Sequence, residues 1–295
     1  MSSITFKSVS KKFGSIQALD NLTFFVNHGS TGILGPNGSG KTTMMKVLTG
    51  LLRPDSGEVL VNDIEVVKEP KKAMKFVGSL IEQPEFYTYL TGYETLEFAC
   101  RIRGLSKIDT LTEIQRVSKL TGCNTYLDRR TGGYSRGMKQ RLGLSLALAG
   151  DPDILVLDEP TFGLDPKGMK ELGSLILDLR KVKTILFSTH IISEAKELCD
   201  RVIIMENGIQ KYDSIDDNAN ETISISISGR ISNIPDLSKF GSYSFKENLI
   251  LVSKTDGVEN SDIVELLVKN GIKIQTVESY NNIEGKYLSV VEHAS

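Results

Sequence analysis

A glycine-rich segment near the N-terminal end constrains this chain more than any other feature of its sequence. Residues 35–43 read Gly-Pro-Asn-Gly-Ser-Gly-Lys-Thr-Thr and fit the pattern G-x-x-x-x-G-K-[ST]. An apolar run at Thr31–Leu34 precedes this segment, and a helical pattern over Thr42–Leu48, ended by Gly50, follows it. A strand, a glycine-rich turn and a helix in this order predict a phosphate-binding loop within an α/β fold.

The residue types of this loop match the chemistry of a polyphosphate. Glycines let the backbone curl so that its N–H groups converge on phosphate oxygens, and the helix N-terminus adds a positive dipole end. The Lys41 ammonium can neutralise the β and γ phosphates, and the Thr42 hydroxyl can bind Mg²⁺. The expected nucleotide-binding residues are Gly35, Pro36, Asn37, Gly38, Ser39, Gly40, Lys41, Thr42 and Thr43. The loop alone does not separate kinases, GTPases and transport ATPases.

Two consecutive carboxylates follow a second apolar strand. Ile154–Leu157 predicts a buried strand, and Asp158 and Glu159 come directly after it. Beside a phosphate loop, Asp158 would hold Mg²⁺ through its water shell, because this ion prefers carboxylate oxygens and dehydrates reluctantly. Glu159 would face the γ phosphate and polarise the attacking water. A kinase or small GTPase does not need the second acid, so the pair favours a nucleotide hydrolase.

Five further segments resemble, in their order along the chain, the motifs of ABC-type ATPases, the nucleotide-binding subunits of transporters. They are Lys12-Phe13-Gly14, Ile81-Glu82-Gln83-Pro84, Tyr134-Ser-Arg-Gly-Met-Lys-Gln140, Gly163-Leu-Asp-Pro166 and Ser188-Thr189-His190. The resemblance covers about residues 3 to 212. It implies that the triphosphate is ATP, bound with Mg²⁺ and hydrolysed.

The resemblance also implies roles for single residues. Phe13 would stack on adenine, and Gln83 would reach both Mg²⁺ and the attacking water. Ser135 and Gly137 would bind the γ phosphate held by an opposite subunit. Asp165 lies in the loop that would cross the dimer interface.

His190 corresponds to the switch histidine of the family, and its place has a physical reason as well. It follows the strand predicted at Thr184–Phe187, and parallel strand ends gather at one sheet edge, where ligands bind. The implied catalytic residues are therefore Glu159 and His190, and the implied metal ligands are Thr42, Gln83 and Asp158.

The signature segment departs from the common Leu-Ser-Gly-Gly-Gln form. Tyr134 replaces the leucine, Arg136 the first glycine and Met138 the glutamine, while Ser135 and Gly137 remain. Similar Tyr-Ser-x-Gly-Met sequences occur in one branch of bacterial exporters. We therefore interpret the departure as a feature of that subfamily and not as the loss of a working site. The alternative is a degenerate site with weak ATPase activity.

The pattern along the chain predicts an α/β P-loop NTPase core of ABC ATPase type with two additions. The expected ATPase domain covers residues 1–215, with a largely parallel sheet and a helical subdomain at about 85–145. Turn signals in that subdomain are Thr91-Gly92, Arg103-Gly104 and Gly132-Gly133. A helix is expected over Pro166–Arg180.

Residues 216–295 are expected to form a small α+β accessory domain after a polar linker at Asp216-Asp217-Asn218. Thr222–Ser228 alternates isoleucine with serine and predicts a half-buried strand. The other expected elements are a strand at Leu249–Val252, a helix capped by Ser261 and ending at Lys269, and a strand at Ile272–Val277.

Composition limits the environment and the partners. The net charge of −2 argues against nucleic acid as a partner. No apolar run approaches the roughly 18 residues needed to cross a bilayer, so transport requires a separate membrane permease. Met1–Gly14 lacks a secretory pattern, and the three cysteines suggest free thiols in a reducing cytosol. We expect a cytoplasmic protein at the inner face of the membrane.

The chain contains two half-sites for the nucleotide, the phosphate loop and the signature segment with Ser135 and Gly137. Together they imply a second copy, or a paralogous ATPase, across the nucleotide. Segments around Glu85–Arg101 are expected to dock a cytoplasmic helix of the permease, although Phe86, Tyr87, Tyr89 and Tyr93 could equally be ordinary packing residues.

The signature and the tail Asn282–Leu288 are similar to exporters of the bacitracin-resistance and lantibiotic-immunity type, whose cargo is a peptide antibiotic or another amphiphile. Two alternatives stay open: a soluble ABC ATPase in DNA repair or translation, and the ATPase of an importer.

Overall fold

The computed structural model describes residues 2–215, 222–228, 235–246, 248–255, 257–279, 283, 286 and 287. The chain divides into two compact units, and the second begins at Asp213, close to the boundary expected after residue 215. The predicted linker at residues 216–218 lies outside the described residues, as does most of the segment 282–288. None of the described helices is long and apolar enough to cross a membrane. The three cysteines are free.

A six-stranded sheet in the order β10-β9-β3-β8-β7-β6 forms the centre of the first unit. The pairs β9–β3, β3–β8, β8–β7 and β7–β6 are parallel, as expected for this α/β class. The strands are β3 (Gly29–Leu34), β6 (Val77–Leu80), β7 (Ile154–Asp158), β8 (Thr184–Thr189), β9 (Arg201–Glu206) and β10 (Ile209–Asp213).

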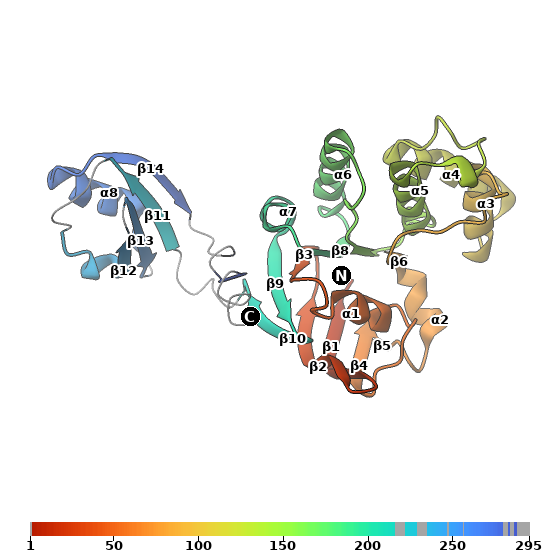
Figure 1. Cartoon of the computed structure of the whole chain (residues 1–295), viewed down its shortest axis with the longest axis horizontal. Coiled ribbons are helices and arrows are strands. Elements are labelled where there is room, and N and C mark those ends of the chain that lie inside the picture. The colour runs from red at the N-terminus through yellow and green to blue at the C-terminus, as the bar shows by residue number, and fades with distance from the viewer. Residues whose placement is uncertain are drawn as a thin grey trace. The chain divides into compact units, whose positions relative to one another are not determined.

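Both faces of this sheet are covered, which explains the continuous apolar strands. On β7, Ile154 and Val156 pack into the cluster that contains α1 (Lys41–Leu48), whereas Leu155 and Leu157 pack against helices on the other face. Figure 1 shows α6 (Pro166–Leu179) and α7 (Ile192–Leu198) on the side opposite α1. The sheet therefore acts as a rigid support for residues at its strand ends.

A second sheet, antiparallel and in the order β2-β1-β4-β5, packs beyond α1 and was not anticipated from the sequence. Gly14 and Ser15 form the turn between its first two strands, and Ile4 and Phe6 point into the core two residues apart. Its elements are β1 (Ile4–Phe13), β2 (Ile16–Val26), β4 (Ser56–Val61) and β5 (Ile64–Glu65), followed by the short helices α2 (Pro70–Ala73) and η1 (Met74–Phe76).

Three helices and one short 3₁₀ segment occupy the region where the helical subdomain was expected. They are α3 (Gly92–Ile102), α4 (Lys107–Thr121), η2 (Thr131–Gly133) and α5 (Arg136–Leu148). The turn predicted at Thr91-Gly92 is instead a helix start. Thr91 caps α3, because its hydroxyl accepts the Glu94 N–H and the Glu94 carboxylate accepts the Thr91 N–H.

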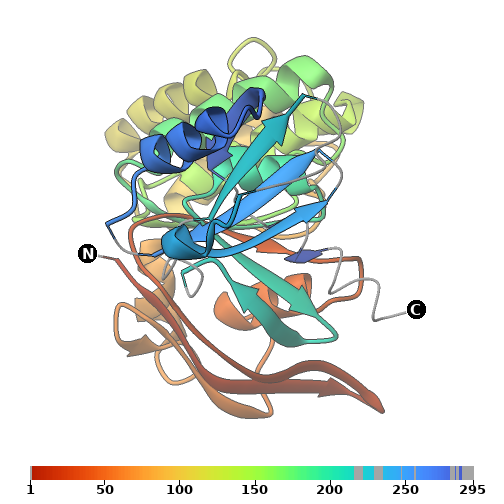
Figure 2. The ribbon, with the colours of Figure 1, turned by 90° about the vertical axis from the view of Figure 1, so that its left-hand side faces the viewer.

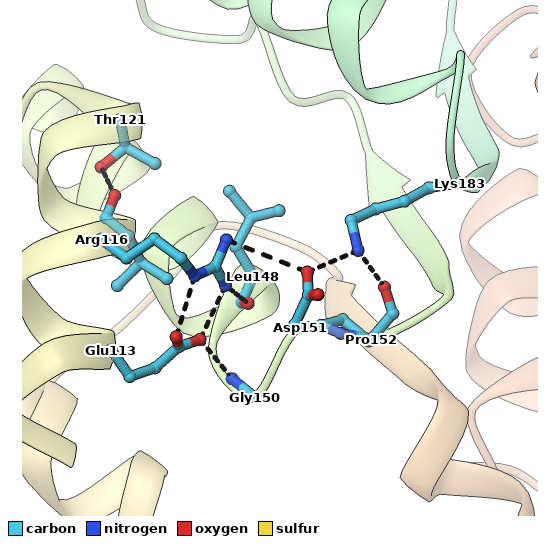
Figure 3. A network of polar contacts seen from close by, with 9 residues as sticks. Glu113, Arg116, Thr121, Leu148, Gly150, Asp151, Pro152 and Lys183 are labelled. Atoms are coloured by element: carbon cyan, nitrogen blue, oxygen red, sulfur yellow. Dashed lines mark hydrogen bonds and ion pairs between the residues drawn. The ribbon is translucent and has the colours of Figure 1, made fainter. Parts of the chain in front are cut away.

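A polar network joins α4 to the chain that leads into β7 (Figure 3). The Glu113 carboxylate accepts two hydrogen bonds from the Arg116 guanidinium, at 2.8 and 2.7 Å, and one from the Gly150 N–H at 2.7 Å. Arg116 also donates to the Leu148 carbonyl at 2.9 Å, and Asp151 pairs with Lys183 at 2.7 Å. The network fastens the helical region to the sheet at the edge opposite the phosphate loop.

Replacing Glu113 by glutamine is expected to lower the free energy of unfolding by about 1–2 kcal/mol near neutral pH. Burial works to raise the pKa of Glu113, but the Arg116 hydrogen bonds and charge and the Gly150 N–H outweigh it and hold that pKa below its usual range. A lowered carboxyl pKa stabilises the fold above about pH 4.3 and loses that contribution as the pH falls through the folded-state value. The difference between the two chains should therefore shrink below about pH 4.

Urea unfolding of both chains between pH 7 and pH 3 measures this difference. Glu97→Gln is the matched control, because Glu97 forms an exposed pair with Arg101 on α3 and should change stability by less than about 0.5 kcal/mol. A Glu113→Gln deficit that stays constant down to pH 3 would contradict the prediction.

The described part of the second unit contains a four-stranded antiparallel sheet in the order β12-β13-β11-β14, with the helix α8 packed on it (Figure 2). The alternation predicted for Thr222–Ser228 is confirmed, since Ile223, Ile225 and Ile227 are buried. The elements are β11 (Thr222–Ile227), η4 (Ser238–Phe240), β12 (Gly241–Lys246), β13 (Leu249–Lys254), α8 (Asn260–Lys269) and β14 (Ile274–Ser279).

Three details of this unit differ from the sequence expectations. The cap of α8 is Glu259 and not Ser261, because the Asp262 carboxylate accepts the Glu259 N–H and thereby starts the helix two residues earlier. The last strand begins at Ile274 instead of Ile272, and β12 was not predicted.

Candidate functional site

The glycine-rich loop joins β3 to α1 at the carboxyl edge of the six-stranded sheet. Gly40 precedes the first residue of α1 with φ of +101°, and a Cβ there would lie 2.5 Å from the Ala18 carbonyl oxygen. A Cβ on Gly35 would lie 2.4 Å from the Met205 carbonyl oxygen. Only glycine fits these two positions, so the loop can curl tightly in front of the helix N-terminus.

Lys41 is 5% exposed, and its ammonium donates to the carbonyl oxygens of Gly35 at 2.7 Å and Pro36 at 3.0 Å. Burial lowers the pKa of Lys41, while the negative charges of Glu159 and Asp158 act in the opposite direction. The buried Ser39 hydroxyl lacks a protein partner within the described part of the chain. A buried cation, an unused hydroxyl and a helix N-terminus together fit a phosphate chain.

Asp158 ends β7 directly opposite the start of α1. Its carboxylate accepts the Thr42 hydroxyl at 2.7 Å through Oδ2 and the Ser188 hydroxyl at 2.5 Å through Oδ1. A hydroxyl and a carboxylate in contact are hard oxygen donors of the kind that Mg²⁺ binds alongside water and phosphate. The donor set of Thr42 and Asp158 therefore fits this ion.

Glu159 follows with a left-handed backbone, at φ of +44°. Its N–H donates to the Ser188 hydroxyl at 3.0 Å, and its Oε1 lies 3.1 Å from Nδ1 of His190. The structure thus brings the two expected catalytic residues into contact through the neighbouring ends of β7 and β8.

A pocket of about 370 Å³ opens between the loop and these carboxylates. Five of the sequence-predicted residues line it: Asn37, Thr42, Gln83, Asp158 and Glu159. Three lining residues were missed: Glu82, Gln140 and Phe162. Gln140 lies at the end of the signature segment, and its amide donates to the Pro160 carbonyl at 2.8 Å. That position could have suggested a role for Gln140, whereas nothing in the sequence indicated Phe162.

Four predicted binding residues outside the phosphate loop do not line this pocket. Phe13 is 45% exposed on β1, with the Lys11 ammonium 5.7 Å from the centre of its ring. Ser135 is the N-cap of α5 and accepts the Met138 N–H at 3.3 Å. Asp165 caps α6 in the same way at 2.9 Å, and Gly137 follows Ser135 in the first turn of α5. Phe13, Ser135 and Asp165 are exposed, and Gly137 is half-buried.

Two departures of the signature segment have structural explanations. Tyr134 is buried in an apolar core cluster and donates its hydroxyl to the Tyr126 carbonyl at 2.8 Å, so it combines apolar packing with a hydrogen bond. The Arg136 guanidinium lies over the Phe162 ring at 5.4 Å. Both leave the Ser135 hydroxyl and the following N–H groups at the helix start.

Comparison with known proteins agrees with this geometry. Residues 19–162 match the family model for ABC transporters. The ABC transporter ATP-binding protein YhcH of Bacillus subtilis (strain 168) is 33% identical over 96% of this chain and 94% of its own length. The bacitracin transport ATP-binding protein BcrA of Bacillus licheniformis is 40% identical over 68% of this chain and 65% of its own.

A solved structure extends the likeness to the fold. A dimeric ATP-binding cassette in a post-hydrolysis state, bound to ADP and phosphate, superposes with a TM-score of 0.66. It is 26% identical and covers 71% of this chain and 97% of its own. The loop, the acidic strand end and the relatives agree: this chain belongs to the ATP-binding proteins of ABC transporters and is an ATP hydrolase.

Proposed function

We propose that this chain hydrolyses ATP between two copies of itself, or between itself and a paralogous ATPase, to power a membrane permease that exports an amphiphile. The single observation that carries the enzymatic part is the hydrogen-bond chain from Thr42 through Asp158 and Ser188 to Glu159 and His190. These hydrogen bonds connect Thr42 of the phosphate loop with Glu159, the carboxylate that we propose as the base.

Mg²⁺ would be held by Thr42 and Asp158, with Gln83 reaching it from the wall of the same pocket. When bound, the ion neutralises charge on the β and γ phosphates. Lys41 supplies a second positive charge from the protein itself, and the loop N–H groups fix the phosphates in place.

Glu159 is the proposed general base. The water oxygen bonds to the γ phosphorus, the bond from that phosphorus to the bridging oxygen of ADP breaks, and the water proton passes to the Glu159 carboxylate. His190, 3.1 Å from Oε1, orients that carboxylate and can contact the γ phosphate. The products are ADP and inorganic phosphate.

A second copy would complete each site. The exposed Ser135 hydroxyl can donate to a phosphate while it accepts the Met138 N–H, and the N-terminus of α5 adds a positive dipole end. Triphosphate would bridge the loop of one copy and this helix start of the other. Hydrolysis removes the bridge, so the pair opens again.

Bacitracin transport, named for BcrA, supports a peptide antibiotic or similar amphiphile as cargo. YhcH supports an ABC transporter role for the whole chain, because that match includes the C-terminal unit. The permease would dock on the helical region, where Tyr87, Tyr89 and Phe98 expose 60% or more of their surface. Antibiotic resistance and lantibiotic immunity are the corresponding biological roles.

Deleting the chain from its host is expected to sensitise the cells to bacitracin-like peptide antibiotics, and returning it should restore resistance. Phe98→Asp should fail to restore resistance and should lower co-purification with the membrane permease by roughly tenfold or more, as expected for loss of an exposed aromatic anchor. The ATPase activity of the purified variant should stay unchanged.

Phe25→Asp is the matched control, because Phe25 is an exposed phenylalanine on β2, in the antiparallel sheet. Unaltered antibiotic sensitivity of the deletion strain would contradict the proposed cargo. Equal effects of the two substitutions on co-purification would contradict the docking surface.

A further inference from the structure

We propose that Ser188 is a positioning residue for ATP hydrolysis, which holds the metal-binding carboxylate and the catalytic base in one fixed arrangement. The inference rests on the roles proposed above for Asp158 and Glu159. It concerns a residue whose hydroxyl bonds to Asp158 and to the Glu159 N–H.

The Ser188 hydroxyl is fully buried and has two hydrogen-bond partners, of which one accepts a proton from it and the other donates one to it. Its single proton goes to Oδ1 of Asp158 at 2.5 Å, and its oxygen accepts the Glu159 N–H at 3.0 Å. A hydroxyl that donates in one direction and accepts in another cannot rotate without losing a bond. Ser188 therefore fixes two consecutive residues with one atom.

With Ser188 in place, each carboxylate oxygen of Asp158 accepts a hydrogen bond from a different hydroxyl. Oδ2 accepts from Thr42 and Oδ1 accepts from Ser188, so rotation of the carboxylate would break both bonds. Hydrogen bonds from neighbouring side chains orient metal ligands in this way. Ser188 would keep the carboxylate oriented when the Thr42 hydroxyl turns to a metal ion.

The effect on Glu159 concerns its backbone. A glutamate at φ of +44° is in a disfavoured conformation and needs support from its surroundings. Ser188 binds its N–H, and the Phe162 N–H donates to its carbonyl oxygen at 3.0 Å. Both polar groups of the residue are thereby held, which aims the side chain at His190 and the pocket.

The scaffold behind Ser188 is rigid. β8 lies between β3 and β7, and Ser188 pairs in register with Ile33 on one side and Asp158 on the other. A hydroxyl on a central buried strand is located more accurately than one on a loop. The same register brings Ser188 beside the acidic pair.

Ser188→Ala is expected to reduce kcat for ATP roughly 10- to 100-fold, the usual cost of removing a residue that orients a metal ligand. Binding of ATP measured in EDTA should be unchanged, because the hydrogen-bond partners of the Ser188 hydroxyl, Asp158 and Glu159, lie outside the phosphate loop. The gain in ATP affinity on adding Mg²⁺, measured by titration calorimetry, should become smaller. Ser188→Thr should restore most of the activity, since it keeps the hydroxyl.

Ser188→Cys serves if the alanine variant does not fold, because it keeps the volume and offers only weak hydrogen bonds; it should lose kcat as well. Ser30→Ala is the matched control. Ser30 is also a buried serine on a central strand, bonded to the Asp200 carboxylate at 3.1 Å, but at the opposite sheet edge. It should lower the unfolding temperature and leave kcat and the Mg²⁺ response unaltered.

Two outcomes would overturn the inference. In the first, Ser188→Ala and Ser188→Cys both keep kcat within about twofold of the unmodified chain. In the second, Ser30→Ala loses as much kcat as Ser188→Ala. Glu159→Gln, assayed alongside, distinguishes a failure of the role of Ser188 from a failure of the proposed catalytic mechanism. An inactive Glu159→Gln with an active Ser188→Ala refutes the role of Ser188 alone. An active Glu159→Gln refutes the proposed mechanism itself.

Discussion

Glu159→Gln is expected to reduce ATP turnover by roughly 10²- to 10⁴-fold while ATP binding persists, because the amide cannot accept the proton of the attacking water. The substitution keeps the size of the side chain and its backbone contacts with Ser188 and Phe162. The phosphate loop and Lys41 are untouched, so ATP should still bind. With hydrolysis blocked, the ATP-bound pair should accumulate as a dimer.

Phosphate release and size-exclusion chromatography with ATP and Mg²⁺ measure these two effects. Glu197→Gln is the control, since Glu197 is an exposed glutamate on α7, a few residues beyond His190. It should match the unmodified chain in both assays. If Glu159→Gln turns over ATP at the normal rate, the proposed base is wrong. If it stays monomeric with ATP, the proposed pairing of two copies around ATP is wrong.

Much of the core could be predicted because its signals are local. Ile154–Asp158 is apolar at every position up to its carboxylate, which indicates a strand covered on both faces, and the structure shows Leu155 and Val156 in two different clusters. The phosphate loop could be predicted in the same way, because a sequence with the pattern of residues 35–43 has few structural roles other than phosphate binding. In both cases one short segment contains the whole argument.

Contacts between distant segments were harder to predict. Ser188 was visible only as the residue two before His190, and its contact with Asp158 follows from strand register, which no single segment specifies. Phe162 lines the pocket because the turn after Glu159 folds back, and Thr91 became a helix cap because Glu94 stands three residues later. Such pairings depend on geometry that composition and spacing do not determine.

Ser135→Phe is the second substitution with a large expected effect, a reduction of turnover by roughly 10²-fold or more. It removes the hydroxyl proposed to bind the γ phosphate held by the second copy, and it places a bulky ring at the start of α5. Binding of ATP to the isolated chain should persist, because Ser135 does not line the pocket formed by the phosphate loop. Ser106→Phe is the control: Ser106 caps the neighbouring helix α4 with a similar bond, at 3.2 Å, and should cost only stability.

Mixing two inactive variants tests whether Ser135 acts on its own chain or on the other. Lys41→Ala disables the loop of one chain and Ser135→Phe the helix start of the other, so a mixed pair contains one intact site, with both parts unmodified. Random pairing should then restore about a quarter of normal turnover, because about half of the dimers are mixed and each has one working site in two. The recovered activity should disappear on dilution as the pairs separate. A mixture no more active than its two components would show that the serine does not complete a site across the pair.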